Sequence, residues 1–93
     1  MRTAAKRDKN EQGIIEALEQ VGATVYRANG KDFPDLVVGF RGLNYLIEVK
    51  YLYGKLSKGQ HRWHESWLGQ RAVVWNIEQA LQVIGAIDND KGG

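Results

Sequence analysis

The 93-residue sequence contains no cysteine, which excludes both a disulfide framework and a thiolate metal site. Any bound metal would need oxygen or imidazole ligands. No apolar run approaches the ~20 residues of a membrane-spanning helix, and the opening MRTAAKRDKNEQ lacks the apolar segment of a signal peptide. No G-x-x-x-x-G-K-[ST] phosphate-binding loop occurs, so we expect no nucleotide cofactor. We therefore expect a cytoplasmic protein without a membrane partner.

A chain of this length has room for one domain with one modest hydrophobic core. No internal repeat or low-complexity tract divides it, so we predict a single domain over residues 1–93. Residues 1–7 and 88–93 are expected to be flexible.

Basic residues are clustered although the net charge is only +2. No acidic residue lies between Lys50 and His64, a stretch that also contains Lys55, Lys58 and Arg62. Such a cluster favours a polyanionic partner, but a solvated charged surface explains it equally well.

The apolar pattern alternates between helical and strand periodicity. It predicts a helix from Asp8 to Val21 that stops at Gly22, followed by three strands in ATVYRA, DLVVGF and LNYLIEVKY. The last two strands form a hairpin through Arg41-Gly42. Ser57 can cap a helix that runs to about Leu68, and RAVVWNI and EQALQVIGAI predict a strand and a last helix. The predicted fold class is α/β (α+β), in the order α-β-β-β-α-β-α, with a mixed central sheet flanked by helices.

Asp35, Glu48 and Lys50 are the candidate catalytic residues of the hairpin. Side chains alternate along a strand, so Glu48 and Lys50 share one face. A two-residue loop sets Asp35 opposite Glu48, with Cβ atoms roughly 4.5 to 5.5 Å apart. Carboxylates at this distance destabilise a sheet unless one is protonated or a cation, such as a hard divalent ion, lies between them. Lys50 could then orient water or offset phosphoryl charge, so the pattern predicts metal-assisted hydrolysis.

A purely structural interpretation of the same residues is also open. Asp35 could simply start a strand after Pro34, and Glu48 and Lys50 could form an exposed ion pair. A three-residue loop would pair Asp35 with Val49 instead of Glu48. The combination of Pro-Asp, correct strand parity and a linking hairpin favours the functional interpretation.

Pro34-Asp35 and Glu48-Val49-Lys50 together resemble the PD-(D/E)xK nuclease superfamily. More narrowly, Gln60 in KLSKGQHRWHESWLGQ is similar to the glutamine that opens the next helix in small stand-alone VRR-NUC nucleases of bacteriophages and bacteria. The resemblance covers residues 8 to about 84. It implies a restriction-endonuclease-like fold and a single VRR-NUC-like domain.

The resemblance also implies roles for individual residues. Asp35, Glu48 and the carbonyl of Val49 would bind Mg²⁺ or Mn²⁺. Lys50 would position or activate the water, and Gln60 would lie at the edge of the site.

An acidic residue on the first helix is implied as well. Glu11 lies four residues before Ile15 and seven before Leu18, on the buried face, whereas Glu16 lies on the wet side. We therefore predict Glu11, with Asp8 as a residue that could assist.

Several other side chains are candidates for contact with DNA. We expect these contacts from Lys55, Lys58, His61, Arg62 and, on the first helix, Arg7. His61 and His64 have the spacing of zinc ligands but lack two further ligands, so we interpret both as surface or DNA-contacting residues. For Trp63 and Trp67, core packing is favoured over base stacking. Phe33 precedes Pro34 where many VRR-NUC relatives have glycine.

These residues and the resemblance predict a Mg²⁺- or Mn²⁺-dependent endonuclease that hydrolyses DNA phosphodiester bonds. A domain this small can contact little duplex alone, so we expect a homodimer with two sites. The resemblance implies a branched substrate such as a Holliday (four-way) junction, and we expect the cytoplasm of a bacterium or a phage-infected host. A non-catalytic nucleic-acid-binding module and an RNA-cleaving enzyme with the same site are the alternatives, because nothing in the sequence separates DNA from RNA.

Overall fold

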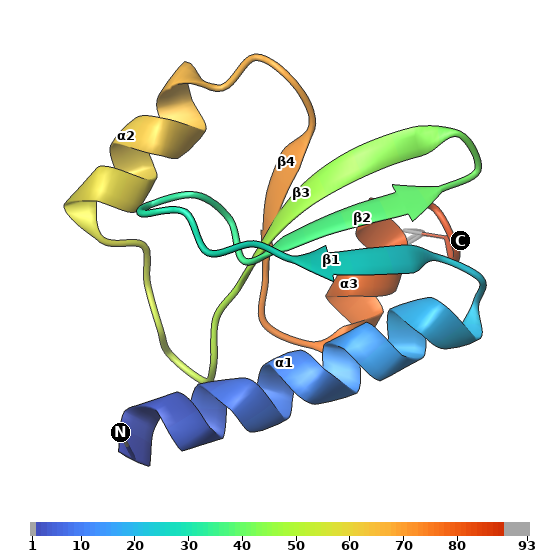
Figure 1. Cartoon of the computed structure of the whole chain (residues 1–93), viewed down its shortest axis with the longest axis horizontal. Coiled ribbons are helices and arrows are strands. Elements are labelled where there is room, and N and C mark those ends of the chain that lie inside the picture. The colour runs from blue at the N-terminus through green and yellow to red at the C-terminus, as the bar shows by residue number, and fades with distance from the viewer. Residues whose placement is uncertain (1, 89–93) are drawn as a thin grey trace.

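The computed structural model of the chain describes residues 2–88, with side chains from Asn10 onward. Its elements follow the predicted order: α1 (Arg2–Gln20), β1 (Thr24–Arg27), β2 (Leu36–Phe40), β3 (Leu43–Val49), α2 (Lys58–Ser66), β4 (Arg71–Val74) and α3 (Ile77–Val83). Figure 1 shows α1 and α3 on one side of a central sheet and α2 apart from both. A mixed four-stranded sheet flanked by helices confirms the predicted fold class.

Some element boundaries differ from the prediction. α1 begins at Arg2 rather than Asp8, so residues 2–7 continue the helix. The strand predicted in RAVVWNI is limited to β4, because the Asn76 side chain accepts a hydrogen bond from the Gln79 backbone N–H at 2.8 Å and caps α3. The expected flexibility of residues 1–7 and 88–93 stays a prediction, and residues 1 and 89–93 lie outside the described part of the chain.

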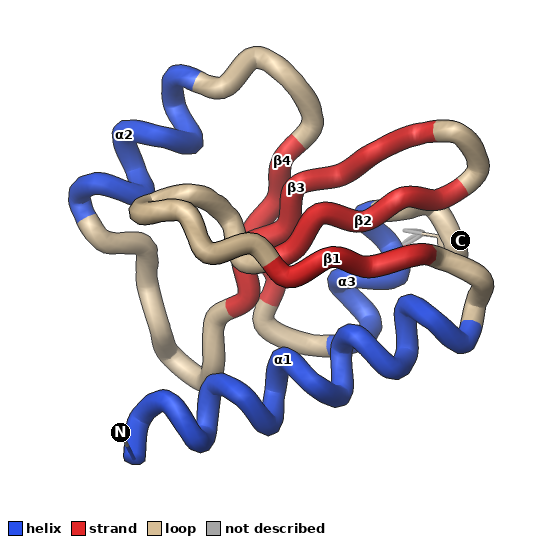
Figure 2. Tube along the Cα trace, viewed as in Figure 1, coloured by secondary structure: helices blue, strands red, loops and turns tan. Residues whose placement is uncertain are grey.

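The strands follow one another in the order β1-β2-β3-β4. The first three are antiparallel, and β4 runs parallel to β3. Arg41 and Gly42 form the predicted two-residue loop, and both have the positive φ (53° and 85°) that a type I′ turn requires. Leu36 pairs with Ile47 and Gly39 with Asn44, so the predicted register is confirmed. A parallel pair needs a crossover, and the segment containing α2 supplies it (Figure 2).

The hydrophobic core lies between one face of the sheet and the helices α1 and α3. Its fully buried side chains include Ile14 and Leu18 from α1 and Val38 and Ile47 from the hairpin. Alternation along the strands turns the opposite set of side chains, including Glu48, to the other face. Within residues 2–88, no helix has the length and apolar character needed to cross a membrane.

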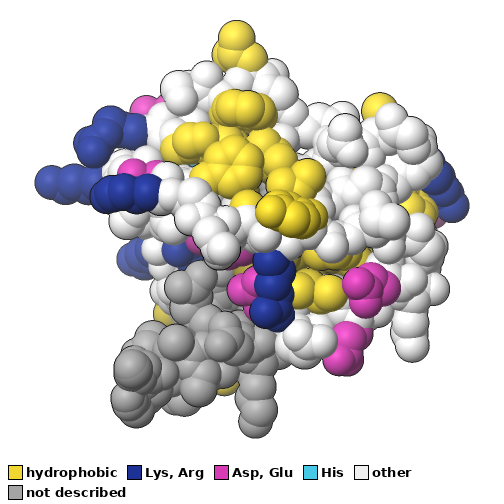
Figure 3. Space-filling view, in the orientation of Figure 1, with side chains coloured by type: hydrophobic (Ala, Val, Ile, Leu, Met, Phe, Trp, Pro, Cys, Tyr) yellow, Lys and Arg dark blue, Asp and Glu magenta, His cyan; other side chains and the backbone are white. Residues whose placement is uncertain are grey.

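α2 meets the loop between β1 and β2 through aromatic rings. The Phe33 ring packs edge-on against Trp63, with centroids 5.3 Å apart, and against Trp67, at 6.4 Å. The two indoles stack at 4.9 Å. Figure 3 shows hydrophobic side chains gathered in this region of the surface. The predicted core role of both tryptophans is wrong, because these rings lie outside the hydrophobic core and join α2 to the loop.

A second contact joins the same loop to the first turn of α2. A Cβ added at Gly59 would lie 2.6 Å from Cγ of Asp32, closer than real Cβ contacts allow. Asp32 itself has a φ of 62°, in the left-handed region. The absence of a side chain at Gly59 therefore lets the loop that leads to Asp35 approach the helix that carries Gln60.

Candidate active site

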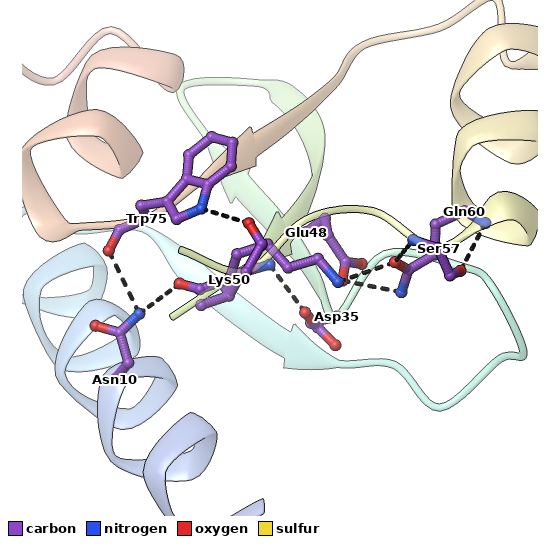
Figure 4. A network of polar contacts seen from close by, with 9 residues as sticks. Asn10, Asp35, Glu48, Lys50, Ser57, Gln60 and Trp75 are labelled. Atoms are coloured by element: carbon purple, nitrogen blue, oxygen red, sulfur yellow. Dashed lines mark hydrogen bonds and ion pairs between the residues drawn. The ribbon is translucent and has the colours of Figure 1, made fainter. Parts of the chain in front are cut away.

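The hairpin brings Asp35 and Glu48 together as predicted. Leu36 pairs with Ile47, so the same register sets Asp35 opposite Glu48. The Asp35 carboxylate is fixed by a further contact, because its Oδ2 accepts a hydrogen bond of 2.8 Å from the backbone N–H of Val49. Asp35 directly precedes β2, and its carboxylate lies against the end of β3 that contains Glu48 and Val49. Figure 4 shows Asp35 beside Glu48 and Lys50.

Glu48 is buried, with 1% of its surface exposed. A glutamate side chain in water is charged at neutral pH, so its burial is unusual. Its Oε2 lies 3.1 Å from Nζ of Lys50 and accepts a hydrogen bond of 3.1 Å from Nε2 of Gln60. A buried carboxylate needs such partners, since burial of an uncompensated charge is strongly destabilising. The exposed Glu48–Lys50 ion pair of the structural interpretation is therefore wrong: the pair is sheltered, with the Lys50 side chain 13% exposed.

Gln60 connects Lys50 to the start of α2. Its Oε1 accepts hydrogen bonds from Lys50 Nζ and from the backbone N–H of Ser57, both at 2.9 Å. The Ser57 hydroxyl in turn accepts a hydrogen bond of 3.2 Å from the Gln60 backbone N–H, which completes a capping box. With two donors at Oε1, the amide must present its NH₂ group to Glu48. The helix cap thus orients the side chain that holds Glu48 and Lys50.

Asn10 and Trp75 support the site from elements distant in sequence. Asn10 on α1 donates hydrogen bonds to the carbonyls of Lys50 at 2.8 Å and Trp75 at 3.4 Å, so it joins the ends of β3 and β4. The Trp75 indole N–H donates to the Gly54 carbonyl at 3.0 Å. Neither residue is predicted as part of the site from the sequence, because neither lies in a motif. The S-x-x-Q spacing of Ser57 and Gln60, in contrast, was a visible capping-box signal.

The acidic residue expected on α1 lies on the sheltered side of the helix. The Glu11 side chain is 12% exposed and pairs with Arg27 Nε at 3.4 Å. Glu16 is exposed and accepts a hydrogen bond from Gln12. The side chain of Asp8 lies outside the described residues. Among the side chains of residues 10–88, no three or more acidic or imidazole groups come close enough to hold one metal. Asp35 and Glu48 are therefore a pair among the described side chains, and the catalytic role of Glu11 stays a prediction.

The expected nucleic-acid contacts fall on α2 and the loop before it. The side chains of Lys55, Lys58, His61 and Arg62 are exposed, and that of Arg7 lies outside the described residues. The surface interpretation of His64 is wrong, since it is only 8% exposed. Burial lowers the pKa of His64 below its usual value, and the positive charges of Arg71, His61 and Lys50 act in the same direction.

The chemistry of the paired carboxylates suits a hard divalent cation. Asp35, Glu48 and the carbonyl of Val49 offer only oxygen atoms, the donors that Mg²⁺ and Mn²⁺ prefer. The ammonium group of Lys50, held beside Glu48, supplies a positive charge at the same point. An arrangement of this kind can bind a phosphate ester and favour attack on it by water.

Comparison with known proteins supports a domain of nuclease type. No protein-family model and no curated protein matches the chain. A solved structure described as a VRR_NUC domain superposes with a TM-score of 0.71 and 26% sequence identity, covering 85% of this chain and 94% of that one. The resemblance predicted from the sequence is thereby confirmed. The chain forms a VRR-NUC-like domain of nuclease type.

Proposed function

We propose that the protein is a metal-dependent endonuclease that hydrolyses phosphodiester bonds of DNA, acting as a homodimer on branched DNA such as a four-way junction. The observation that carries the proposal is the arrangement of Lys50 and Gln60 around the buried Glu48, beside Asp35. An ordinary surface charge pair is exposed and has no such support, whereas this ion pair is sheltered and is held by the side chain of a helix cap. A non-catalytic binding surface would need none of these contacts.

The residues that would hold Mg²⁺ or Mn²⁺ are Asp35, Glu48 and the carbonyl of Val49. When bound, the ion would supply Lewis-acid stabilisation of negative charge on the phosphate. A water oxygen attacks phosphorus in line with the leaving oxygen: one P–O bond forms, the other breaks, and the proton of the water is released as the leaving oxygen gains one. The Lys50 ammonium, held by Gln60, would orient that water or stabilise the charge that develops.

A cleavage assay over a panel of substrates tests the proposal. Labelled single-stranded, duplex, splayed and four-way-junction DNA, each with an RNA counterpart, are incubated with Mg²⁺, Mn²⁺ or EDTA. Asp35→Asn keeps the shape of the side chain and an acceptor for the Val49 N–H, and Glu16→Gln is the matched control on an exposed acid. We expect cleavage only with metal. Asp35→Asn should lower the cleavage rate roughly 10²- to 10³-fold, and Glu16→Gln should cleave at the wild-type rate.

Each alternative has its own result in the same assay. Binding of nucleic acid without cleavage under every metal condition would replace the proposal with the non-catalytic module. Cleavage confined to the RNA counterparts would keep the site and change the substrate. Sedimentation of the protein with and without the junction tests the dimer, and a monomer in both samples would overturn that part.

A further inference from the structure

The turn that follows Lys50 has a conformation that its residues do not favour. In Tyr51–Gly54, the Gly54 N–H donates a hydrogen bond of 2.9 Å to the Tyr51 carbonyl. Leu52, the second residue of the turn, has a φ of 52° in the left-handed region. Glycine or asparagine usually occupies such a position, because a leucine Cβ is crowded there. A strained residue of this kind persists only where the surrounding structure holds it, and strained residues cluster at functional sites.

The two residues at the tip of the turn expose apolar surface. Leu52 is 61% exposed and Tyr53 is 91% exposed. Neither side chain belongs to the hydrophobic core or packs against it. The strain at Leu52 is therefore not offset by burial of the side chains that it presents. The turn holds a leucine and a tyrosine in water beside the candidate active site.

The turn is fixed close to Lys50. The Trp75 indole N–H donates to the Gly54 carbonyl at 3.0 Å. A Cβ added at Gly54 would lie 3.5 Å from Cβ of Lys50, so the turn folds back on the residue assigned to the chemistry. A substrate held at Lys50 would have its neighbouring nucleotides within reach of the turn.

We propose that Leu52 and Tyr53 contact the bases next to the cleaved phosphodiester, by insertion between them or by stacking on them. This inference rests on the proposed function, and it specifies a substrate whose bases are unstacked or unpaired beside the cleavage point. Leucine is one of the side chains that proteins wedge between base steps, and tyrosine is one on which exposed bases stack. Charge supports a nucleic-acid partner, because the exposed Lys55 and Lys58 follow the turn and no acid lies between Glu48 and Glu65.

Fluorescence of 2-aminopurine tests the contact without relying on cleavage. The base analogue is placed at successive positions of single-stranded and four-way-junction DNA and of matching RNA, and binding is measured in EDTA. Leu52→Asn and Tyr53→Ser remove the apolar tips, while Leu68→Asn and Tyr26→Ser are matched controls at residues that are 98% and 70% exposed. Cleavage by the wild-type protein and by the two turn variants is measured separately with Mg²⁺ and Mn²⁺.

We expect wild-type protein to change the fluorescence at one or two adjacent positions, and Tyr53→Ser to bind roughly 5- to 100-fold more weakly. Leu52→Asn should lose the signal while its Tm stays equal or rises, because asparagine tolerates the left-handed conformation. A purely structural role for Leu52 would lower Tm instead. The controls should keep the wild-type signal.

The inference and the proposed function fail in different ways. If the wild-type protein cleaves but both turn variants bind and cleave as it does, the inference is overturned and the nuclease stands. A fluorescence change that depends on the turn, with no cleavage under any metal condition, keeps the contact and overturns the nuclease. Absence of any fluorescence change with the wild-type protein overturns the inference directly.

Discussion

The two faces of the sheet are held by different kinds of interaction. On the face covered by α1 and α3, Ile47 of the sheet and Leu18 of α1 are fully buried among apolar side chains. On the opposite face, Glu48 is equally buried, but Lys50 and Gln60 surround it with polar contacts. Apolar packing is tolerant of direction, whereas each polar contact has a fixed partner and geometry. We therefore expect substitutions on the apolar face to lower stability alone, and substitutions on the polar face to lower the cleavage rate as well.

The largest expected effect comes from the ammonium group of Lys50. Lys50→Met should lower the cleavage rate by roughly 10²- to 10³-fold, because charge on the phosphate loses its stabilising partner. It should also lower the free energy of unfolding, measured in EDTA, by about 3 kcal/mol, since the buried Glu48 carboxylate loses the Lys50 ammonium group as its ion-pair partner. The double variant Lys50→Met with Glu48→Gln should regain stability but not activity. Because Glu48→Gln also removes a proposed metal ligand, recovery of activity in the double variant would contradict the roles of both residues.

A core substitution should lower stability without lowering the cleavage rate. Leu18→Ala removes a fully buried side chain, and we expect about 2 to 5 kcal/mol of lost stability, measured by urea unfolding. The cleavage rate per folded molecule should stay near that of the wild type. Val21→Ala, at a position 40% exposed, is the matched control and should cost far less. A core variant that stays folded but has lost its cleavage rate would contradict the separation of the two faces.

Gly59 offers a test of how the β1–β2 loop and α2 are placed together. Gly59→Ala forces the Asp32 carboxylate away from the new Cβ, and because Asp32 lies shortly before Asp35 we expect cleavage to fall by up to about tenfold. Asp32→Gly removes that carboxylate and also suits the φ of 62° at this position. The double variant should regain activity, as a double-mutant cycle would measure. Additive losses would show that the two residues act independently.

The smallest expected effect is a pH dependence of stability caused by His64. Its pKa is lower in the folded protein than in the unfolded chain, so the unfolded state binds more protons as the pH falls below about 6.5. The contribution of the neutral imidazole to the free energy of unfolding is thus fully present above that pH and is lost as the pH falls through the folded-state pKa. Urea unfolding between pH 5 and 8 should show a loss at acid pH that His64→Gln removes and His61→Gln keeps. An equal loss in His64→Gln would assign it to other groups.

The sequence predicted what depends on local pattern. The Arg41-Gly42 loop determined the register and placed Asp35 opposite Glu48, and Ser57 was identified as a helix cap. These features involve neighbours in the chain or a single hairpin, where periodicity and turn chemistry are sufficient.

Contacts between distant segments could not be predicted in this way. Asn10 reaches the Lys50 carbonyl across 40 positions, and Phe33 meets Trp63 because a loop folds over α2. The surface position predicted for His64 is wrong for a related reason. The short helix has no clear apolar periodicity, so the sequence does not show that another segment covers this side chain. The turn at Leu52 was visible as a loop, but its left-handed φ was not.

The central claim is that Asp35 and Glu48 bind a divalent cation that activates cleavage beside Lys50. The most direct test is the single-turnover cleavage rate of labelled DNA as Mn²⁺ or Mg²⁺ is increased, in the wild-type protein and in Asp35→Asn. We predict a saturable rise from no cleavage in the wild type, and in Asp35→Asn a curve displaced to higher metal concentration with a much lower plateau. Identical curves for the two proteins, or cleavage that is unaffected by EDTA, would contradict the claim.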